Sequence, residues 1–547
     1  MTTTTVAPTT RRNVLLVFAG LMVAMLLASL DQTIFSTALP TIVGQLDGVN
    51  HMLWVTTAYI LASTIVMPVY GKLGDLVGRK WLFIAAIGLF IVGSVVGGMA
   101  GSMTALIVGR AIQGLGGGGL MILAQAIIAD VVPARERGKY SGIMGAVFAI
   151  SSVAGPLLGG FFTDGPGWRW AFWMNLPLGA IAIASAVFFL KLPKGSTSKP
   201  RIDYAGMTVL ALAATCLVLF TTWGGNTYDW NSPVILGLIA GTVVAAVAFL
   251  LIERRAAEPV IPLHLFKNRN FNLTTAAGLI VGVAMFGALA YMPTYLQMVT
   301  GVGATQAGFL MIPMMGALLV SSVVSGQIVS KTGRYKAIPV VGTVLVAVAL
   351  TLMSTLLATT AVWIICVYLA IMGLGLGMSM QILILVVQNS FPVSQVGTAT
   401  ASNNFFRQIG SSLGSAVVGS LFVSRLTASL ADNLPAGASG GSNTNSLTPA
   451  VVNSLPQGVR NIIVGAYNES LAPIFLYLVP LVLVAAVLLL FVQEKPLATT
   501  IDRADDAKSA VESAVAADVR EPQLALLVAD ESAAADRTHP STGLVIA

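Results

Sequence analysis

The chain is 547 residues long, and 56% of these residues are hydrophobic while only 9% carry a charged side chain. Ordinary soluble domains have roughly 25% charged residues, because their surfaces face water. The composition therefore excludes a soluble globular protein and is typical of a chain that lies mostly within a lipid bilayer.

The apolar residues fall in runs of about twenty or more, the length of α-helix that crosses about 30 Å of hydrocarbon. The first run follows Arg11 and Arg12. It is too long for a signal peptide and contains Asp31, so we expect an uncleaved spanning helix. The runs predict fourteen spanning helices, near residues 14–39, 52–70, 81–100, 104–129, 140–162, 171–190, 205–222, 234–252, 272–297, 306–329, 338–357, 362–387, 398–423 and 471–492. The expected fold class is an all-α polytopic membrane protein.

The basic residues gather on one side of this predicted topology. With the N-terminus inside, nineteen lysines and arginines before residue 493 fall in cytoplasmic segments, and three, Arg169, Arg425 and Arg460, fall on the other side. This bias predicts a bacterial-type cell (inner) membrane protein with both termini in the cytoplasm. It also explains the net charge of +7, so we expect no nucleic-acid partner.

Two polar segments fall outside the predicted helices. Residues 425–470, rich in Ser, Gly, Asn and Thr, are expected to form an external loop, and residues 493–547 a disordered cytoplasmic tail. The two cysteines, Cys216 and Cys366, lie in apolar runs without metal-ligand neighbours. We expect them to be small buried hydrophobic residues, and we expect no metal site.

A short repeat relates the loop after the second predicted helix to the loop after the tenth. The first reads Gly-Lys-Leu-Gly-Asp-Leu-Val-Gly-Arg-Lys over residues 71–80, and the second reads Gly-Gln-Ile-Val-Ser-Lys-Thr-Gly-Arg over residues 326–334. Two glycines and the arginine recur in register, while Asp75 becomes Ser330. Because each loop follows the second helix of a six-helix block, we expect a parallel repeat about an axis normal to the membrane.

This repeat gives the predicted domain organisation. We expect a cytoplasmic N-terminus (1–13), an N-terminal six-helix bundle (14–190), a linker with inserted helices seven and eight (191–270), a C-terminal six-helix bundle (271–492) and the tail (493–547).

Motifs in the first half carry a family resemblance. They are Leu30 to Ile34 running to Ala38-Leu39-Pro40, Gly71 to Lys80, Arg110 to Gly114, Ala154 to Gly160, and Trp168-Arg169-Trp170 running to Asn175-Leu176-Pro177. In combination they resemble the EmrB/QacA branch of the major facilitator superfamily, the fourteen-helix drug/proton antiporters. The resemblance covers residues 14–492. It implies a major facilitator fold of two six-helix bundles plus an inserted pair, and proton-driven export by alternating access.

The resemblance also implies that Gly155, Pro156, Gly159 and Gly160 form the antiporter motif of the fifth helix. Small residues allow helices to approach closely, and proline removes a backbone donor and permits a bend. The fifth helix is therefore either a surface on which the two halves rock or a plain packing element.

Asp31 is the acidic residue that we place well inside a predicted helix, where ionisable groups are costly and usually functional. Counting 1.5 Å per residue from the predicted helix ends puts Asp31 and Arg110 at a similar depth. Burial raises the pKa of a carboxylic acid and a nearby guanidinium lowers it, so a movement that changes either would load or release a proton. Asp31 is the predicted proton-coupling site and Arg110 its tuner, as the resemblance also implies. The alternative is a permanent structural ion pair.

The expected energy source is the proton-motive force, with no cofactor and no ATP. The chain has no GxxxxGK[ST] phosphate-binding loop. Residues 114–119 fit the GxGxxG pattern, but no strand precedes them and they lie in a predicted membrane helix. Close helix packing is therefore favoured over a dinucleotide site.

The first repeat loop is predicted to be a cytoplasmic gate formed by Gly71, Asp75, Gly78, Arg79 and Lys80. A charge network around Asp75 can hold the halves together in the outward-open state and yield in the inward-open state. The alternative is a solvated basic loop that serves topology only. Because Ser330 replaces the acid, we expect the second half to contribute less to this gate.

Polar or aromatic residues at mid-depth are the candidates for a substrate cavity, namely Gln113, Gln125, Tyr291, Gln381, Asn403 and Arg407. Most isolated polar residues in such helices form interhelical hydrogen bonds instead, so each candidate has this second interpretation. The sequence does not choose among neutral, monocationic and anionic amphiphiles.

The expected function is proton-coupled secondary active export of small amphipathic compounds such as drugs or antibiotics, not enzymatic catalysis. The expected partners are this substrate, protons and the lipid bilayer. The alternatives are export of an endogenous lipid or secondary metabolite, a membrane sensor that binds without transporting, and a channel.

Overall fold

The computed structural model describes residues 11–46, 51–190, 192, 202–225, 227–433, 452 and 455–499, in which the regular elements are all helices. Within these ranges, fourteen helical segments are long and apolar enough to cross a membrane. The predicted fold class and the predicted number of spanning helices are therefore confirmed.

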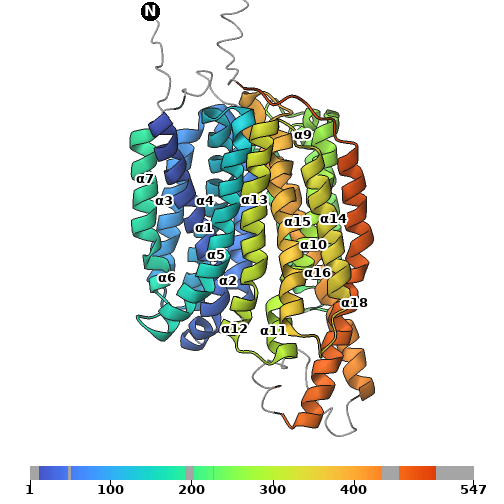
Figure 1. The fold of residues 1–547 in the computed structure, drawn as a ribbon. Helices are drawn as coiled ribbons and strands as arrows, with labels where there is room; N and C mark the ends of the chain where they lie inside the picture. Colours follow the sequence, from blue (N-terminus) through green and yellow to red (C-terminus); the bar gives the residue numbers. More distant parts are fainter. Residues whose placement is uncertain are drawn as a thin grey trace, which may run out of the picture. The chain divides into compact units, whose positions relative to one another are not determined.

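The first seven helices form one group, the N-terminal half, whose successive spanning helices run in opposite directions (Figure 1). They are α1 (Arg11–Gln45), α2 (Met52–Val77), α3 (Arg79–Gly98), α4 (Met103–Val131), α5 (Ala134–Asp164), α6 (Trp170–Trp173) and α7 (Asn175–Phe189). We call the end of this bundle at which α1 begins the near end, and the opposite end the far end.

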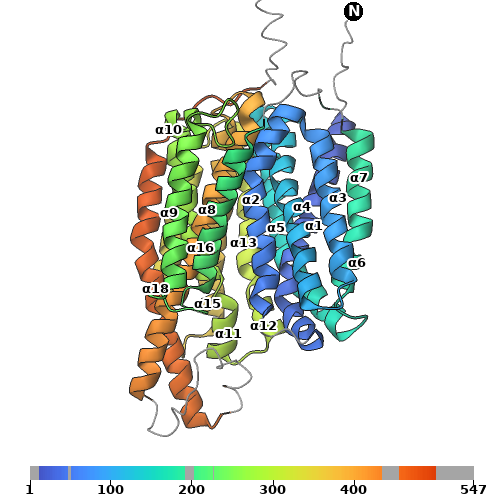
Figure 2. The same ribbon diagram turned by 180° about the vertical axis from the view of Figure 1, so that it is seen from behind.

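The next two helices are an inserted pair, α8 (Tyr204–Trp223) and α9 (Pro233–Glu253). They pack on each other, and α8 also packs on α2 and on α16 of the second half. Figure 2 shows the pair beside α2, on one flank of the helices. Leu210 and Ala214 of α8 are buried in a small apolar cluster with Phe405 of α16.

The remaining helices form the C-terminal half. After η2 (Leu263–Lys267) come α10 (Arg269–Leu289), α11 (Met292–Thr300), α12 (Ala304–Leu310), α13 (Ile312–Thr332), α14 (Ala337–Ser354), α15 (Val362–Gln388), η3 (Val393–Gln395), α16 (Val396–Asn433) and α18 (Gln457–Leu490). Two predicted single helices are interrupted here, one between α10 and α11 and one between α12 and α13. Pro293 and Pro313 stand in the first turns of α11 and α13, where a proline lacks no needed donor.

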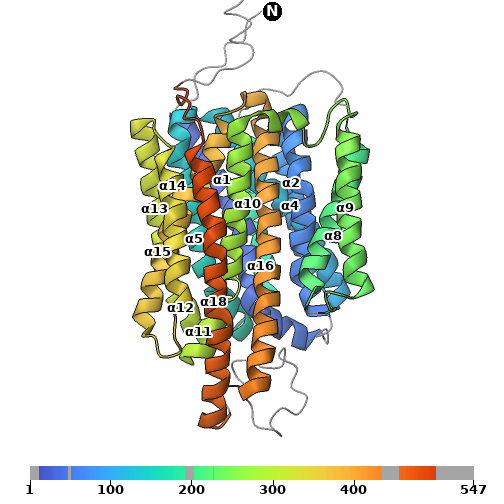
Figure 3. The same ribbon diagram turned by 90° about the vertical axis from the view of Figure 1, so that its right-hand side faces the viewer.

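The predicted external loop 425–470 is wrong at its boundaries. Helix α16 continues to Asn433 and α18 already begins at Gln457, and both extend past the other helices at the far end (Figure 3). Leu426 and Ile463 in these extensions are buried in the same apolar cluster, which explains why helices persist through a polar stretch. Most of the residues between the two helices lie outside the described ranges.

A strap of residues 493–499 crosses the near end after α18. Gln493 exchanges two backbone-to-side-chain hydrogen bonds with Asn270 of α10, at 2.8 and 2.9 Å. The Oε1 atom of Glu494 accepts hydrogen bonds from the backbone N–H groups of Tyr335 at 2.6 Å and Lys336 at 3.2 Å. These contacts fix the strap to the C-terminal half.

The strap also reaches the N-terminal half, because the carbonyl of Ala498 accepts a hydrogen bond of 3.0 Å from the backbone N–H of Arg135 at the start of α5. The prediction of disorder from residue 493 is thus wrong for residues 493–499, where backbone and carboxylate groups find partners on helix ends. The rest of the predicted tail, 500–547, lies outside the described residues.

Buried apolar residues separate largely by half. Two clusters belong to α1–α7, and the largest cluster lies almost wholly in α10–α18. The halves meet mainly where α5 packs on α13 and α2 packs on α16. This arrangement places the faces of eight helices around the interface between the halves, where the cavity described below lies.

Candidate functional site

Asp31 of α1 is completely buried in the N-terminal half. Its Oδ2 atom forms an ion pair with Nη1 of Arg110 on α4. Its Oδ1 atom accepts hydrogen bonds from Nε2 of Gln113 at 2.9 Å and from Nδ2 of Asn175 on α7 at 3.0 Å. The same two amides donate to the hydroxyl of Ser94 on α3, so four helices hold this carboxylate in place.

Arg110 lies between two aromatic rings as well as beside the carboxylate. Its guanidinium carbon is 4.3 Å from the ring centre of Phe35 and 4.4 Å from that of Tyr59. Gln113, three residues later on the same helix face, accepts a hydrogen bond of 2.9 Å from Arg110 Nη1. Tyr59 on α2 also lines the cavity described below, so this residue contacts both the buried ion pair and the cavity.

The Asp31 cluster lies wholly within the N-terminal half. Each of its hydrogen-bond and ring partners named above belongs to α1–α7. Oδ1 of Asn175 is buried and has no hydrogen-bond partner within the described part of the chain. Rotation of that amide by half a turn would direct an acceptor toward Asp31 in place of the present donor.

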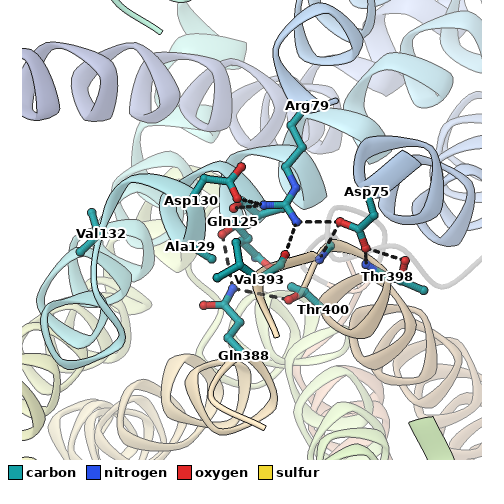
Figure 4. Close-up of polar contacts among 12 residues, drawn as sticks. Asp75, Arg79, Gln125, Ala129, Asp130, Val132, Gln388, Val393, Thr398 and Thr400 are labelled. Carbon is teal, nitrogen blue, oxygen red and sulfur yellow. Dashed lines mark hydrogen bonds and ion pairs between the residues drawn. The ribbon is translucent and has the colours of Figure 1, made fainter. Parts of the chain in front are cut away.

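A second charge cluster lies at the near end, where the two halves touch (Figure 4). Nη2 of Arg79 donates to Oδ1 of Asp75 at 2.6 Å, and Nη1 forms an ion pair with Asp130 at the end of α4. Nη2 also donates to the backbone carbonyl of Val393 in the C-terminal half at 3.0 Å. Arg79 therefore joins two helices of its own half to the opposite half.

Asp75 also joins the halves directly. It accepts hydrogen bonds from the backbone N–H groups of Gly397 at 3.2 Å and Thr398 at 2.7 Å, and from the Thr398 hydroxyl at 2.7 Å. These donors belong to the first turn of α16, where the helix dipole favours a negative charge. Asp75 thus satisfies otherwise unpaired donors at the start of a helix in the other half (Figure 4).

The remaining residues of the predicted gate have separate roles. A Cβ atom on Gly71 would lie 2.3 Å from that of Ala401, so only glycine allows α2 to approach α16 this closely. Gly78 has φ of 99° and makes the turn from α2 into α3. Lys80 lies apart from the cluster and donates to the carbonyl of Val187 on α7 at 2.9 Å.

The repeated loop in the C-terminal half has the same two glycine roles, but none of its residues takes part in the ion pairs of the described residues. A Cβ atom on Gly326 would lie 2.0 Å from the carbonyl oxygen of Gly138 on α5, and Gly333 has φ of 74°. The carbonyl of Ser330 accepts a hydrogen bond of 3.3 Å from Nε of Arg135. Arg334, the counterpart of Arg79, is exposed. The two contacts between the halves are therefore similar in shape and different in charge.

The four motif residues of α5 lie against α1, within the N-terminal half, or face open space. A Cβ atom on Gly155 would lie 2.0 Å from Oγ1 of Thr33, and one on Gly159 would lie 2.1 Å from Oγ1 of Thr37. The carbonyl of Pro156 accepts a long hydrogen bond of 3.5 Å from Thr37. A Cβ atom on Gly160 would meet nothing within 4 Å.

A cavity of about 200 Å³ lies between the halves, lined by α1, α2, α4 and α5 on one side and α10, α13, α15 and α16 on the other. Three of the six predicted cavity residues line it, namely Gln125, Gln381 and Arg407. The other three face their own half: Gln113 binds Asp31, the Tyr291 hydroxyl donates to the Ser415 carbonyl, and Asn403 donates to Thr275. The polar lining residues that the sequence did not predict are Gln32, Tyr59, Ser63, Ser322, Asn404, Gln408 and Ser411.

Hydrogen bonds between the halves close the cavity toward the near end. Nδ2 of Asn404 donates to Oε1 of Gln125 at 3.0 Å, and Nε2 of Gln388 donates to the Gln125 carbonyl at 3.3 Å. Gln125 and Gln388 lie next to the Asp75 and Arg79 cluster (Figure 4). The near end is thus closed by an amide layer backed by a charge layer.

Comparisons with known proteins agree with this arrangement. The family model described as Major Facilitator Superfamily matches residues 21–415. An uncharacterized MFS-type transporter of Mycobacterium tuberculosis is 42% identical over 499 residues, which cover 91% of this chain and 72% of that protein. Multidrug resistance protein 3 of Bacillus subtilis is 35% identical over 515 residues, which cover 92% of this chain and 99% of that protein.

Among solved structures, the proton:xylose symporter XylE of the major facilitator superfamily matches with a TM-score of 0.57 and 15% sequence identity. The match covers 89% of this chain and 98% of that one. At this identity the likeness shows the fold alone.

Proposed function

Because the chain belongs to the Major Facilitator Superfamily of membrane transporters, we propose that it exports small amphipathic compounds in exchange for protons. The observation that carries the proposal is the completely buried carboxylate of Asp31, which is paired with Arg110 beside the cavity. A buried ionisable group at membrane depth is costly and marks a proton or ion pathway by default.

Cargo and proton sites that are adjacent but separate suit an exchanger. Tyr59 contacts Arg110 on one side and lines the cavity on the other. A cargo that displaces this ring would change the surroundings of the ion pair, and protonation of Asp31 would in turn release Arg110 toward the ring. Each ligand then disfavours the other, as exchange requires.

The near end is assigned to the cytoplasm, because the basic residues of the chain gather in the loops there. In this orientation the described state is closed toward the cytoplasm by Asp75, Arg79 and the amides around Gln125. Opening this end would admit cargo from the cytoplasm or the inner leaflet. The name of the relative Multidrug resistance protein 3 supports drugs as part of the cargo range.

The proton-motive force supplies enough free energy. One proton that moves inward yields about 2.3 kcal/mol per 100 mV of membrane potential and about 1.4 kcal/mol per pH unit. At 100 mV and one pH unit the sum supports a concentration ratio of a few hundredfold for a neutral cargo, at roughly tenfold per 1.4 kcal/mol.

The test uses the full-length protein in liposomes that contain a trapped pH indicator. We choose 2-naphthalenesulfonate, 2-naphthalenesulfonamide and (2-naphthylmethyl)trimethylammonium as cargo, because none of them carries protons across lipid at neutral pH. Addition of a transported probe outside should move protons out of the vesicle lumen. A protein that binds a probe but moves no proton in either direction would contradict the exchange proposal.

A further inference from the structure

We propose that the cavity is built for anionic amphiphiles, with Arg407 of α16 as the residue that binds the acidic head group. The inference deepens the proposed function by naming the cargo class of the same cavity. It starts from the charges on the cavity wall. Of the residues that line the cavity, Arg407 alone has a charged side chain, and no aspartate or glutamate lines it.

Arg407 has no carboxylate partner among the described residues. The ion pairs found there involve Lys72, Arg79 and Arg110 but not Arg407. Its one side-chain hydrogen bond runs from Nη2 to Oδ1 of Asn404, one turn earlier on the same helix. A guanidinium has five N–H donors in a fork that matches carboxylate, sulfonate or phosphate oxygens. An isolated charge next to a membrane cavity is costly unless a ligand of opposite charge completes it.

The remainder of the wall suits the apolar body of such a compound. Methionines from both halves line the cavity, among them Met67, Met121, Met285 and Met380, together with Phe148 and Phe286. Flexible thioethers adapt to different shapes and make favourable contacts with aromatic rings. At about 200 Å³ the cavity is smaller than the roughly 300–1,000 Å³ of drug-sized sites, so it holds a small amphiphile or the head and first ring of a larger one.

Binding of an anion to Arg407 would also affect the hydrogen bonds that close the near end. Asn404 accepts from Arg407 through Oδ1 and donates through Nδ2 to Gln125 of the other half. An anion that binds the guanidinium of Arg407 removes one hydrogen-bond partner of Asn404. This loss weakens the layer of amide hydrogen bonds among Asn404, Gln125 and Gln388 at the near end of the cavity. A cationic or neutral cargo has no such means of acting on this layer, so the arrangement links recognition of an acid to the contact between the halves.

The experiment measures binding of the three naphthalene probes to the full-length protein in lipid nanodiscs by equilibrium dialysis, with protein-free nanodiscs as the blank for partition into lipid. We expect 2-naphthalenesulfonate to bind at least about tenfold more tightly than the neutral sulfonamide, as one charge-assisted pair allows. The trimethylammonium probe should bind most weakly. Equal affinities for the three probes, or tightest binding of the ammonium probe, would overturn the inference.

Variants assign the preference to one residue. Arg407→Gln should reduce 2-naphthalenesulfonate binding about tenfold and leave sulfonamide binding within about twofold, because only the charged contact is removed. Arg407→Lys should retain part of the preference, since the charge remains and the fork is lost. Arg425→Gln is the matched control, since Arg425 is a half-buried arginine of the same helix that lies outside the cavity lining and donates to the Tyr477 hydroxyl. A sulfonate preference that survives in Arg407→Gln would overturn the inference, and if that variant does not fold, the order of probes on the unaltered protein decides.

The outcome separates this inference from the proposed exchange. A protein that holds the sulfonate through Arg407 but moves no proton in liposomes retains the anion site and loses the exchange mechanism. A protein that exchanges protons for the ammonium probe in preference to the sulfonate supports the exchange mechanism and contradicts the anion site.

Discussion

The two buried clusters of carboxylate and arginine differ in the helices that they join. The Asp31 and Arg110 cluster takes its partners from α1–α7 alone. The Asp75 and Arg79 cluster takes partners from both halves, through the carbonyl of Val393 and the first turn of α16. If the halves rock as rigid bodies, the first cluster can stay intact while the second must break.

Because they join different helices, the two clusters are expected to have different roles in transport. In the proposed exchange mechanism, the Asp31 cluster is the proton site, and the Asp75 cluster holds the near end closed. Protonation of Asp31 would then act on the Asp75 cluster only through the packing between them. A variant of the Asp31 cluster should therefore change proton movement strongly and access from the near end weakly. A variant of the Asp75 cluster should do the opposite.

The largest effect is expected for Asp31→Asn, which removes the proton-binding group and keeps the side-chain size. Cargo-driven proton movement in liposomes should fall at least about a hundredfold, toward the protein-free level, because the amide cannot cycle between charged and neutral forms. Downhill cargo exchange should persist. Asp432→Asn, at an exposed position of α16, is the control with the same chemical change. Full proton coupling in Asp31→Asn would remove Asp31 from the mechanism.

A steric change should open the near end without touching any charge. In Gly326→Ala the added methyl group would lie 2.0 Å from the Gly138 carbonyl, so α5 and α13 cannot approach as they do. We expect about a tenfold rise in maleimide labelling, from the near end, of a cysteine that replaces cavity residue Ser63, since overpacking typically costs 1–3 kcal/mol. Cys216 and Cys366 would first be replaced by serine.

The control for this variant is Gly316→Ala on the same helix, because a Cβ atom there would meet nothing within 4 Å. It should leave the labelling unchanged. Equal labelling of the two alanine variants would mean that the close contact between α5 and α13 does not govern access.

Asp75→Asn should have an intermediate effect on the same labelling. The amide keeps the size but loses the charge that the first turn of α16 and Arg79 both favour. We expect a rise of about fivefold, within the 1–3 kcal/mol range of lost charge-assisted bonds after partial replacement by neutral ones. Asp130→Asn, whose carboxylate joins Arg79 only within the N-terminal half, should change labelling less. The opposite order would contradict the distinction drawn between the clusters.

The smallest effect is expected at the strap. Glu494→Gln weakens its attachment to the backbone N–H groups of Tyr335 and Lys336, and should raise Ser63→Cys labelling by about twofold, because neutral acceptors remain. Proton coupling per cargo molecule should not change. A loss of coupling in Glu494→Gln would show that the near end and the proton site are not separable.

The sequence predicts the membrane-spanning elements well because the bilayer imposes their length and composition. Fourteen apolar runs become fourteen spanning segments. The prediction fails where the bilayer does not impose length and composition. Proline interrupts two helices without ending the span. Helices α16 and α18 extend past the apolar region because residues such as Leu426 are buried there. A composition rule for loops cannot detect such packing.

The sequence predicts only part of the site, because it gives the depth of a residue along a helix but not the direction of its side chain. Depth along a helix follows from residue counting, and it brought Asp31 and Arg110 to one level, where the structure pairs them. The direction in which a lone polar side chain points does not follow from counting. Gln125 and Arg407 face the cavity while Gln113 and Asn403 face their own half, although all four are polar residues in apolar helices.

The inserted pair α8 and α9 makes the two flanks of the transporter unequal toward lipid. On one flank, α8 packs over both α2 and α16 and covers the line where they meet. On the other flank, α5 and α13 meet without an inserted helix, and Ile150 and Val324 on these helices are exposed apolar residues. A lipid acyl chain or a membrane-dissolved compound could therefore approach the cavity from the side only between α5 and α13, and the flank with α8 would be closed to such lateral entry.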